Sequence, residues 1–333
     1  MIVENKQIKG MNFITLKNET GMEVTLSDYG AGIYQIKIDG QPMLTGLKDY
    51  EEWMKGSAYH GKCIGRIAGR IQKGKLCFNG KTYQISQNER GNTLHGGVGG
   101  FSYQQFKTDI AQKKECARVD FYYDSPDGDQ GFPGEVMLRV RYIVYEKKNT
   151  LRIEFQSQAN QDTPMDITVH TYFDLGGEKN ILEHNLTIDA DKILTYDDEL
   201  IPDKYVQIPA FMDLREGKQI GKVIENEYFS KLGGLDTAFH KLDRNKETPH
   251  IVLENKNYKV NIYSSYDDVV IFTSNCPPFG MEMNNGNIQE KHSSIAIEPQ
   301  YEALDFPRMM VKKNGVQHNF IAYEFEKKEN QND

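Results

Sequence analysis

The sequence predicts a mainly β protein built from antiparallel strands, with few and short helices. Short segments rich in β-branched and aromatic residues recur along the 333-residue chain, and polar and apolar positions alternate within them, a pattern typical of half-buried strands. Asp-Gly and Asn-Gly dipeptides each separate two such segments, and these dipeptides favour tight two-residue hairpin turns. We therefore expect roughly 20 strands or more, in sheets wide enough to curl or to split into packed layers.

The individual elements follow from this pattern in chain order. The clearest expected strands are 12–16, 32–38, 136–145, 151–155, 259–263 and 269–273. The predicted hairpin turns are Asp39-Gly40 and Asn79-Gly80. Helical periodicity is limited to 50–55 and 224–231. Since no Pro-rich or Gly/Ser-rich linker divides the pattern, we expect a single domain over residues 1–327, followed by a frayed polar tail over 328–333.

Composition limits the class of partner and the compartment. The net charge of −8 and the pI of about 5.6 argue against nucleic acid and against an anionic membrane surface, because both require a basic face. The first ten residues lack the apolar core of a signal peptide, and no apolar run is long enough to span a membrane. Four cysteines, Cys63, Cys77, Cys116 and Cys276, are scattered without a metal-binding spacing. These features predict a cytoplasmic protein with no zinc site and no disulfide framework.

Two segments resemble ligand-binding motifs but fail on their context. Residues 69–75 fit the first positions of a phosphate-binding loop, but Leu76 replaces the required Ser or Thr and a hairpin follows instead of a helix. Residues 124–135 are acidic, but Pro126 and Gly128 stand where a calcium loop needs oxygen ligands. We interpret the second segment as a compact turn between two strands.

Two histidines stand in glycine-rich settings that let a ligand approach closely. His170 lies in the run 169–177, which ends in two glycines, and His95 precedes Gly96-Gly97. An imidazole gives or takes a proton near neutral pH, so either ring suits acid–base chemistry. Either ring could equally be a hydrogen-bonded structural histidine.

Arginines and carboxylates elsewhere could complete a site. Arg66 and Arg70 lie in the glycine-bounded run 65–71, and either could anchor oxygen atoms with its fork of donors. Asp236 follows a glycine, and Glu298 precedes Pro299, which we expect to end the strand close to Glu298 and leave its carboxylate at a rim. Each of these side chains also has a structural explanation, and spacing cannot show that they meet.

The chain resembles the aldose 1-epimerases, the galactose mutarotase family. Seven segments carry the resemblance in the family's order: GRIAGRI (65–71), NTLHGG (92–97), SPDGDQGFPG (125–134), VHTYFDLGG (169–177), LIPDKYVQIP (200–209), GLDTAF (234–239) and IEPQYEALDFP (297–307). The resemblance implies a large antiparallel β-sandwich, the supersandwich of galactose-mutarotase-like proteins. It also implies that the chain interconverts the α and β anomers of a free hexose such as galactose or glucose without a cofactor or a metal.

The resemblance also implies a role for each site residue. His170 would act as the general acid on the ring oxygen, and Glu298 as the general base on the C1 hydroxyl. Arg70, His95 and Asp236 would bind the sugar. The expected partner is therefore a small sugar, with no nucleic acid and no membrane, and the chain is expected to be a monomer or a homodimer.

Three positions depart from the family pattern, which leaves the preferred sugar open. Val169 and Asp174 replace asparagines beside the histidine motif, and Gly69 replaces an asparagine in the first motif. Arg308, Lys312 and Lys313 would be candidates if the sugar carried a phosphate, although a charged surface strand is the simpler interpretation.

Two other function classes remain open. A glycoside hydrolase on a similar β-sandwich would use two carboxylates, for which Asp236 and Glu298 could serve. A non-catalytic carbohydrate-binding protein would bind a sugar without turnover.

Overall fold

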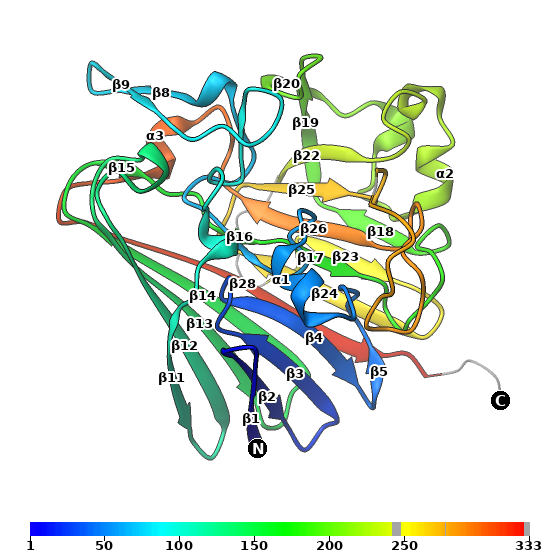
Figure 1. Ribbon diagram of the computed structural model, residues 1–333. Helices are drawn as coiled ribbons and strands as arrows, with labels where there is room; N and C mark the ends of the chain where they lie inside the picture. Colours follow the sequence, from blue (N-terminus) through cyan, green and yellow to red (C-terminus); the bar gives the residue numbers. More distant parts are fainter. Residues whose placement is uncertain (242–247, 277, 330–333) are drawn as a thin grey trace.

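A computed structural model of the chain describes residues 1–241, 248–276 and 278–329. In these residues the chain forms 28 strands and three short α-helices, and every pair of neighbouring strands within the named sheets is antiparallel. The predicted fold class is therefore confirmed. The strands form two packed layers (Figure 1), the arrangement of a β-sandwich.

A nine-stranded sheet forms the back layer of the sandwich in the view of Figure 1. In spatial order its strands are β11 (Lys107–Gln112), β12 (Cys116–Ser125), β13 (Val136–Tyr145), β14 (Thr150–Ala159), β28 (Val316–Lys327), β24 (Tyr258–Ser264), β23 (Ile251–Glu254), β18 (Asn185–Ile188) and β21 (Lys218–Gln219).

Two smaller sheets lie in front of this layer. The five-stranded sheet contains β1 (Ile2–Ile8), β2 (Met11–Lys17), β3 (Met22–Ser27), β4 (Gly32–Ile38) and β5 (Gln41–Pro42). The six-stranded sheet contains, in spatial order, β17 (Thr171–Phe173), β26 (Ile295–Gln300), β25 (Asp268–Phe272), β22 (Asp236–Lys241), β19 (Ala190–Tyr196) and β20 (Pro202–Gln207).

Short strand pairs and helices complete the chain. The pairs are β6 (Cys63–Ile64) with β16 (Thr168–Val169), β7 (Arg70–Ile71) with β10 (Thr93–Leu94), β8 (Lys75–Phe78) with β9 (Lys81–Gln84), and β15 (Thr163–Pro164) with β27 (Met310–Val311). The α-helices are α1 (Tyr50–Lys55), α2 (Ile220–Ile224) and α3 (Phe306–Met309). The 3₁₀ turns are η1 (Gln72–Gly74), η2 (Phe101–Tyr103), η3 (Asp129–Gly131), η4 (Ala210–Met212) and η5 (Glu227–Phe229).

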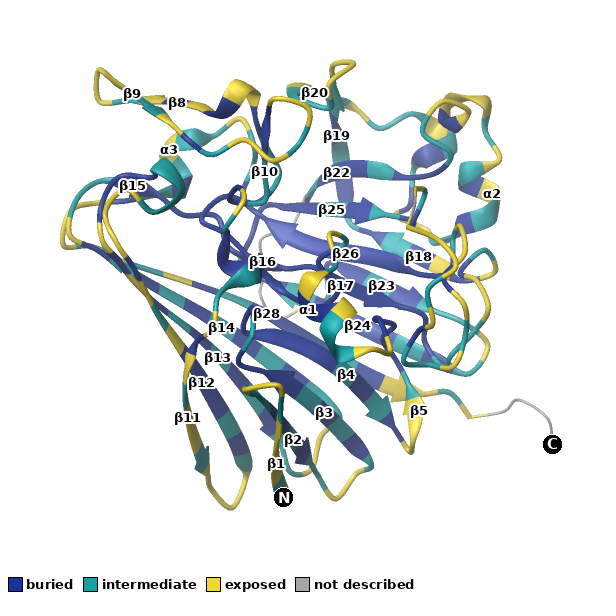
Figure 2. Cartoon of the chain, viewed as in Figure 1, coloured by how far each residue is buried: buried dark blue, intermediate teal, exposed yellow. Residues whose placement is uncertain are grey.

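The hydrophobic core lies between the layers, where Figure 2 shows buried residues on the facing strands. One continuous cluster of buried side chains extends from Ile14 in β2 to Phe325 in β28 and joins all three large sheets. Strands with one face in this core alternate regularly, as β13 does between buried and more exposed positions. Among the described residues, no helix combines the length and apolar character needed to cross a bilayer.

Most of the predicted elements are confirmed. The six expected strands correspond to β2, β4, β13, β14, β24 and β25, and the helix expected at 50–55 is α1. Both hairpin turns are present, since Ile38 pairs with Gln41 and Phe78 pairs with Lys81 across them. The acidic segment 124–135 is a compact turn, as expected, and residues 69–75 are followed by strand β8.

Two local predictions were wrong. The helix expected at 224–231 is instead α2, which ends at Ile224, followed by η5. Asn226 interrupts the helix because its backbone is extended and its side chain accepts a hydrogen bond from the Tyr228 N–H, starting a new turn. Of the expected tail 328–333, residues 330–333 lie outside the described residues.

The second error concerns β26, which continues to Gln300 instead of ending at Glu298. The strand tolerates Pro299 because β17 pairs only with residues up to Ile297, so β26 has a ladder partner on one side alone at Pro299. Glu298 is consequently 2% exposed and does not lie at a rim.

Candidate active site

Strand pairing brings His170 next to Glu298. His170 lies between β16 and β17, where its N–H donates to the Lys62 carbonyl over 3.0 Å and its carbonyl accepts from the Gly61 N–H over 2.8 Å. The next residue, Thr171, pairs with Ile297 of β26. The histidine is therefore fixed by backbone bonds beside the strand that carries the glutamate.

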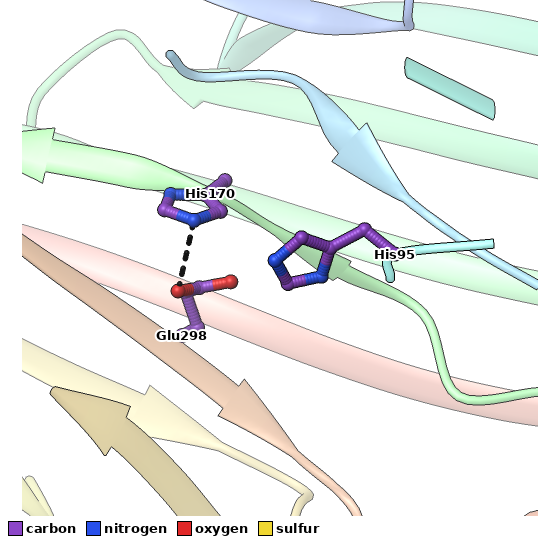
Figure 3. A group of neighbouring side chains, drawn as sticks. All are labelled: His95, His170 and Glu298. Carbon is purple, nitrogen blue, oxygen red and sulfur yellow. Dashed lines mark ion pairs between the residues drawn. The ribbon is translucent and has the colours of Figure 1, made fainter. Parts of the chain in front are cut away.

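The two side chains touch inside a buried environment. His170 Nε2 lies 3.2 Å from Glu298 Oε1, and both side chains are less than a tenth exposed. Figure 3 draws this contact as a dashed line. Tyr172 stacks on the imidazole with centroids 4.8 Å apart, and Tyr59 lies nearly parallel to it at 6.0 Å. These rings restrict the imidazole, so the Nε2 atom stays directed toward the carboxylate.

Burial favours the neutral form of each partner. It holds the pKa of His170 well below its ordinary value of 6.5 and the pKa of Glu298 well above its ordinary value of 4.5. Because Nε2 and Oε1 are in contact, the two groups titrate as a coupled pair that can share a proton between these atoms. With that proton on His170, the pair offers a proton donor and a carboxylate acceptor side by side.

His95 lies beside His170 and Glu298, and its ring is a hydrogen-bond donor with a fixed orientation. Its Nδ1 accepts from the Gly69 N–H over 3.2 Å, and this bond assigns the ring proton to Nε2. Burial, with a smaller effect from Arg70, lowers the pKa of His95 to about 3, so the ring is neutral. Its ring lies edge-on to His170 with centroids 5.4 Å apart.

His95, His170 and Glu298 could by distance hold a metal ion, since one ligand atom from each lies within 4.8 Å of the others. The hydrogen bond at His95 argues against this use. Nε2 could ligate a metal only if the ring proton moved to Nδ1, which would then face the Gly69 N–H as a second donor. The geometry of these three residues fits proton transfer better than metal coordination.

Arg70 and Asp236 lie on two further elements around the pair. Arg70 in β7 makes a bidentate ion pair with Glu89, with its Nε 2.6 Å from Oε2 and its Nη2 2.9 Å from Oε1. Asp236 begins β22, and burial raises the pKa of its carboxyl, while the charge of Arg70 acts in the opposite direction. Arg70 offers hydrogen-bond donors and Asp236 offers acceptors to a polar ligand.

A cavity of about 450 Å³ unites these groups. All five site residues expected from the sequence line it: His170, Glu298, Arg70, His95 and Asp236. Its volume falls in the range of roughly 300–1,000 Å³ typical of small-molecule sites. Polar lining residues that the sequence analysis did not single out include Tyr59, Glu89, Tyr172, Tyr196, Gln289 and Gln300.

The structure distinguishes Arg70 from Arg66, either of which could anchor a ligand on the sequence alone: Arg70 lines the cavity and Arg66 does not. Arg66 is 2% exposed and donates to Ser125 Oγ and to the carbonyls of Pro126 and Pro133 over 2.7–3.0 Å. Its role is therefore structural, because it fixes the turn 125–134. No signal in the sequence distinguishes the two arginines without the family pattern.

The residues considered for a phosphate lie elsewhere. Arg308 pairs with Asp267 over 3.1 Å, Lys312 pairs with Asp162 over 3.3 Å, and none of Arg308, Lys312 and Lys313 lines the cavity. The simpler interpretation, a charged surface strand, was wrong about the element: Arg308 lies in α3, and Lys312 and Lys313 are exposed residues that follow β27.

Of the three unusual positions, only Gly69 lines the cavity. Val169 and Asp174 are fully buried outside it, and Asp174 accepts a hydrogen bond from Asn285. Gly69 has φ of +78° and donates to His95, so a side chain there would strain the turn that sets the His95 tautomer.

Comparison with known proteins places the chain among sugar epimerases. Residues 12–314 match the family described as aldose 1-epimerase. Galactose mutarotase of Sus scrofa is 31% identical over 320 residues, covering 91% of this chain and 90% of the relative. Galactose mutarotase of Homo sapiens is 33% identical over 301 residues, covering 86% and 85%. The crystal structure of galactose 1-epimerase from Lactobacillus acidophilus shares the fold, with a TM-score of 0.88 and 24% identity over 98% of this chain and 100% of the other.

Proposed function

The chain belongs to the aldose 1-epimerase family, and from this premise we propose that it is an isomerase that interconverts the α and β anomers of a free hexose such as galactose or glucose. The observation that carries the proposal is the contact between His170 Nε2 and Glu298 Oε1 inside the cavity. A mutarotase needs one group that removes a proton and one that supplies a proton within reach of the anomeric carbon.

In the proposed reaction, Glu298 is the general base and His170 the general acid. The sugar enters with its C1 hydroxyl at Glu298 and its ring oxygen at His170. Glu298 takes the hydroxyl proton while His170 gives its proton to the ring oxygen, and the bond between C1 and the ring oxygen breaks. Rotation about C1–C2 in the open-chain aldehyde exposes the other carbonyl face, and the same two groups act in reverse as the ring closes.

We propose that the pair enters this cycle in a net-neutral state, with the proton that the two groups share lying on His170. A net-neutral pair with its proton on Nε2 has both catalytic groups in the working state, and ring opening transfers one proton out and one proton in. The pair therefore holds a single proton again once the open-chain sugar has formed. The proposed reaction requires no cofactor.

The remaining site residues are proposed to bind the sugar. His95 donates from Nε2, Arg70 donates from the N–H groups that Glu89 does not occupy, those of Nη1 and the second N–H of Nη2, and Asp236 accepts from sugar hydroxyls. These three side chains surround the catalytic pair without contacting it by a hydrogen bond or ion pair in the described residues. They can thus orient the ring while leaving the acid and the base free.

The two competing classes explain the site less well. A glycoside hydrolase based on Asp236 and Glu298 would leave the buried contact of His170 with Glu298 without a role. A sugar-binding protein without catalysis would not need an acid–base pair. The two similar relatives are named galactose mutarotase, and the similar crystal structure is named galactose 1-epimerase.

Three further proposals concern the whole chain. The continuous core from β2 to β28 supports one domain over residues 1–327. The dispersed cysteines support a cytoplasmic location. The partner is proposed to be a small sugar, with neither nucleic acid nor membrane, and the assembly a monomer or a homodimer.

Polarimetry on freshly dissolved α-D-glucose and α-D-galactose tests the proposed function. The protein should speed the approach to the final rotation well beyond the buffer rate for at least one sugar. Release of reducing sugar from a glycoside, with no effect on mutarotation, would instead support the hydrolase.

A further inference from the structure

Glu89 lines the cavity, but the functions proposed above assign no role to its carboxylate. Its two oxygens bind the Nε and Nη2 groups of Arg70 at 2.6 and 2.9 Å. The side chains of Arg70 and Glu89 are only 17% and 29% exposed. We infer that Glu89 is the positioning residue that fixes Arg70 for the sugar, an inference that rests on the proposed function.

A tight turn holds Glu89 itself in place. Arg90 and Gly91 both have positive φ, +47° and +82°, as in the turn of a two-residue hairpin. Across them, the Glu89 N–H donates to the Asn92 carbonyl over 3.1 Å and the Asn92 N–H donates back over 2.7 Å. The backbone at Glu89 is therefore well fixed, so its carboxylate can restrain a partner.

The same loop is joined to the strand of Arg70. Leu94 pairs with Arg70 between β10 and β7, and the Asn88 side chain bonds both the N–H and the carbonyl of Leu94 at 2.7 and 3.0 Å. His95 follows directly and exchanges hydrogen bonds with Gly69. Arg70, Glu89 and His95 thus belong to one small rigid unit on one side of the cavity.

Glu89 matters because Arg70 has other carboxylates nearby. The charge of Arg70 lowers the pKa of both Asp236 and Glu298 against the stronger effect of their burial. If Glu89 lost its charge, the guanidinium could turn toward Asp236 and occupy the carboxylate proposed to accept from sugar hydroxyls. Glu89 holds Arg70 by the Nε proton and one Nη2 proton, so the other N–H donors of the guanidinium are available to the sugar.

Loss of the Glu89 charge should also change the pKa of Glu298 in the catalytic pair. The ionisable groups around Glu298 are His170, His95 and Tyr172 beside it, Asp236 from β22, Arg70 from β7, Tyr323 from β28 and the more distant Asp166. Without Glu89, the positive charge of Arg70 is unbalanced and further stabilises the ionised Glu298 carboxylate. The limb of the pH–rate profile that reports deprotonation of the pair should then move to lower pH.

The experiment compares Glu89→Gln with Glu199→Gln as the matched control. Glu199 accepts a hydrogen bond from the Asn92 side chain at 3.1 Å and so touches the same loop, but it neither contacts Arg70 nor lines the cavity. Anomer exchange is measured by NMR exchange spectroscopy over a range of sugar concentrations and pH. Glu89→Asp serves as a second variant that keeps the charge but shortens the reach.

We expect Glu89→Gln to raise KM about tenfold, with kcat changed less than about threefold, because lost orientation of Arg70 weakens sugar binding before the chemical step. Its alkaline limb should shift to lower pH, while Glu89→Asp keeps the limb in place and Glu199→Gln matches wild type in both respects. A folded Glu89→Gln protein with wild-type KM and pH profile would overturn the inference. A wild-type protein inactive on every aldose tested would instead contradict the proposed function.

Discussion

Lys62 provides a sharp test of the electrostatics beside the catalytic strand. Its side chain is completely buried, and burial lowers its pKa from the ordinary 10.5 to about 7. Its Nζ donates to the Met54 carbonyl over 2.6 Å and lies 5.0–5.4 Å from the ring centres of Tyr29, Trp53 and Tyr103. The rings favour the charged amine, while burial opposes it.

The lowered pKa has a cost that can be given a magnitude. At pH 7 the unfolded chain holds the Lys62 proton, whereas the folded protein holds it only in part, and this difference destabilises the fold by about 4 kcal/mol. Lys62→Met removes this cost but leaves the Met54 carbonyl without a partner, which costs about 1–3 kcal/mol. We expect the variant to be more stable than wild type at pH 7 by about 1–3 kcal/mol.

The pH dependence gives the clearer signature. Between pH 7 and the ordinary pKa of 10.5 the unfolded state binds more protons than the folded state, so wild-type stability rises with pH. Relative to Lys62→Met, wild type should gain about 2 kcal/mol between pH 7 and pH 9. The measurement is urea unfolding followed by the fluorescence of Trp53, the single tryptophan of the chain.

A matched surface variant and a specific outcome make this prediction refutable. Lys48→Met replaces a lysine that is 64% exposed and paired with Glu282, and its stability should stay within about 0.5 kcal/mol of wild type at both pH values. If Lys62→Met is less stable than wild type by the same amount at pH 7 and pH 9, the amine is charged in the folded protein. The three rings would then outweigh burial, and the reasoning above would be refuted.

The remaining predictions concern the pair and the turn beneath the site. Because burial lowers the pKa of His170, the His170–Glu298 pair should take up a second proton only below pH 6.5. The buffer-corrected mutarotation rate should therefore stay flat from neutral pH down to the pH at which this protonation begins. A fall in rate that begins above pH 7 would contradict the shared-proton state. Arg66→Met should lower the free energy of unfolding by about 3–5 kcal/mol in urea, since it leaves the buried acceptors at Ser125, Pro126 and Pro133 without their donor; a loss below 1 kcal/mol would count against a structural role.

Local patterns in the sequence were sufficient for most strands and turns. Alternation in 136–145 predicted β13 to the residue, because each side chain there meets either the core or the outer face. The prediction of a helix over 224–231 was wrong because hydrophobic periodicity does not take into account that Asn226 caps a separate turn. The end of β26 was misplaced because the effect of Pro299 depends on which neighbouring strand needs its N–H, and this is a tertiary property.

The site depended on long-range register, which spacing along the chain does not encode. His170 and Glu298 meet only because Thr171 pairs with Ile297 in the six-stranded sheet. The family motifs supplied that partnership, but they supplied neither the tautomer of His95 nor the ion pair of Arg70 with Glu89. Both features depend on the pairing of β10 with β7, which brings the loop that contains Glu89 and His95 next to Arg70.

The most direct test of the account is the mutarotation rate of His170→Asn and Glu298→Gln, measured by polarimetry beside wild type. Each variant removes one member of the acid–base pair with little change in size. We expect each to lower the rate at least about 100-fold, the low end of what a positioned acid or base contributes. If both variants remain folded and turn over the sugar near the wild-type rate, the proposed mechanism is contradicted.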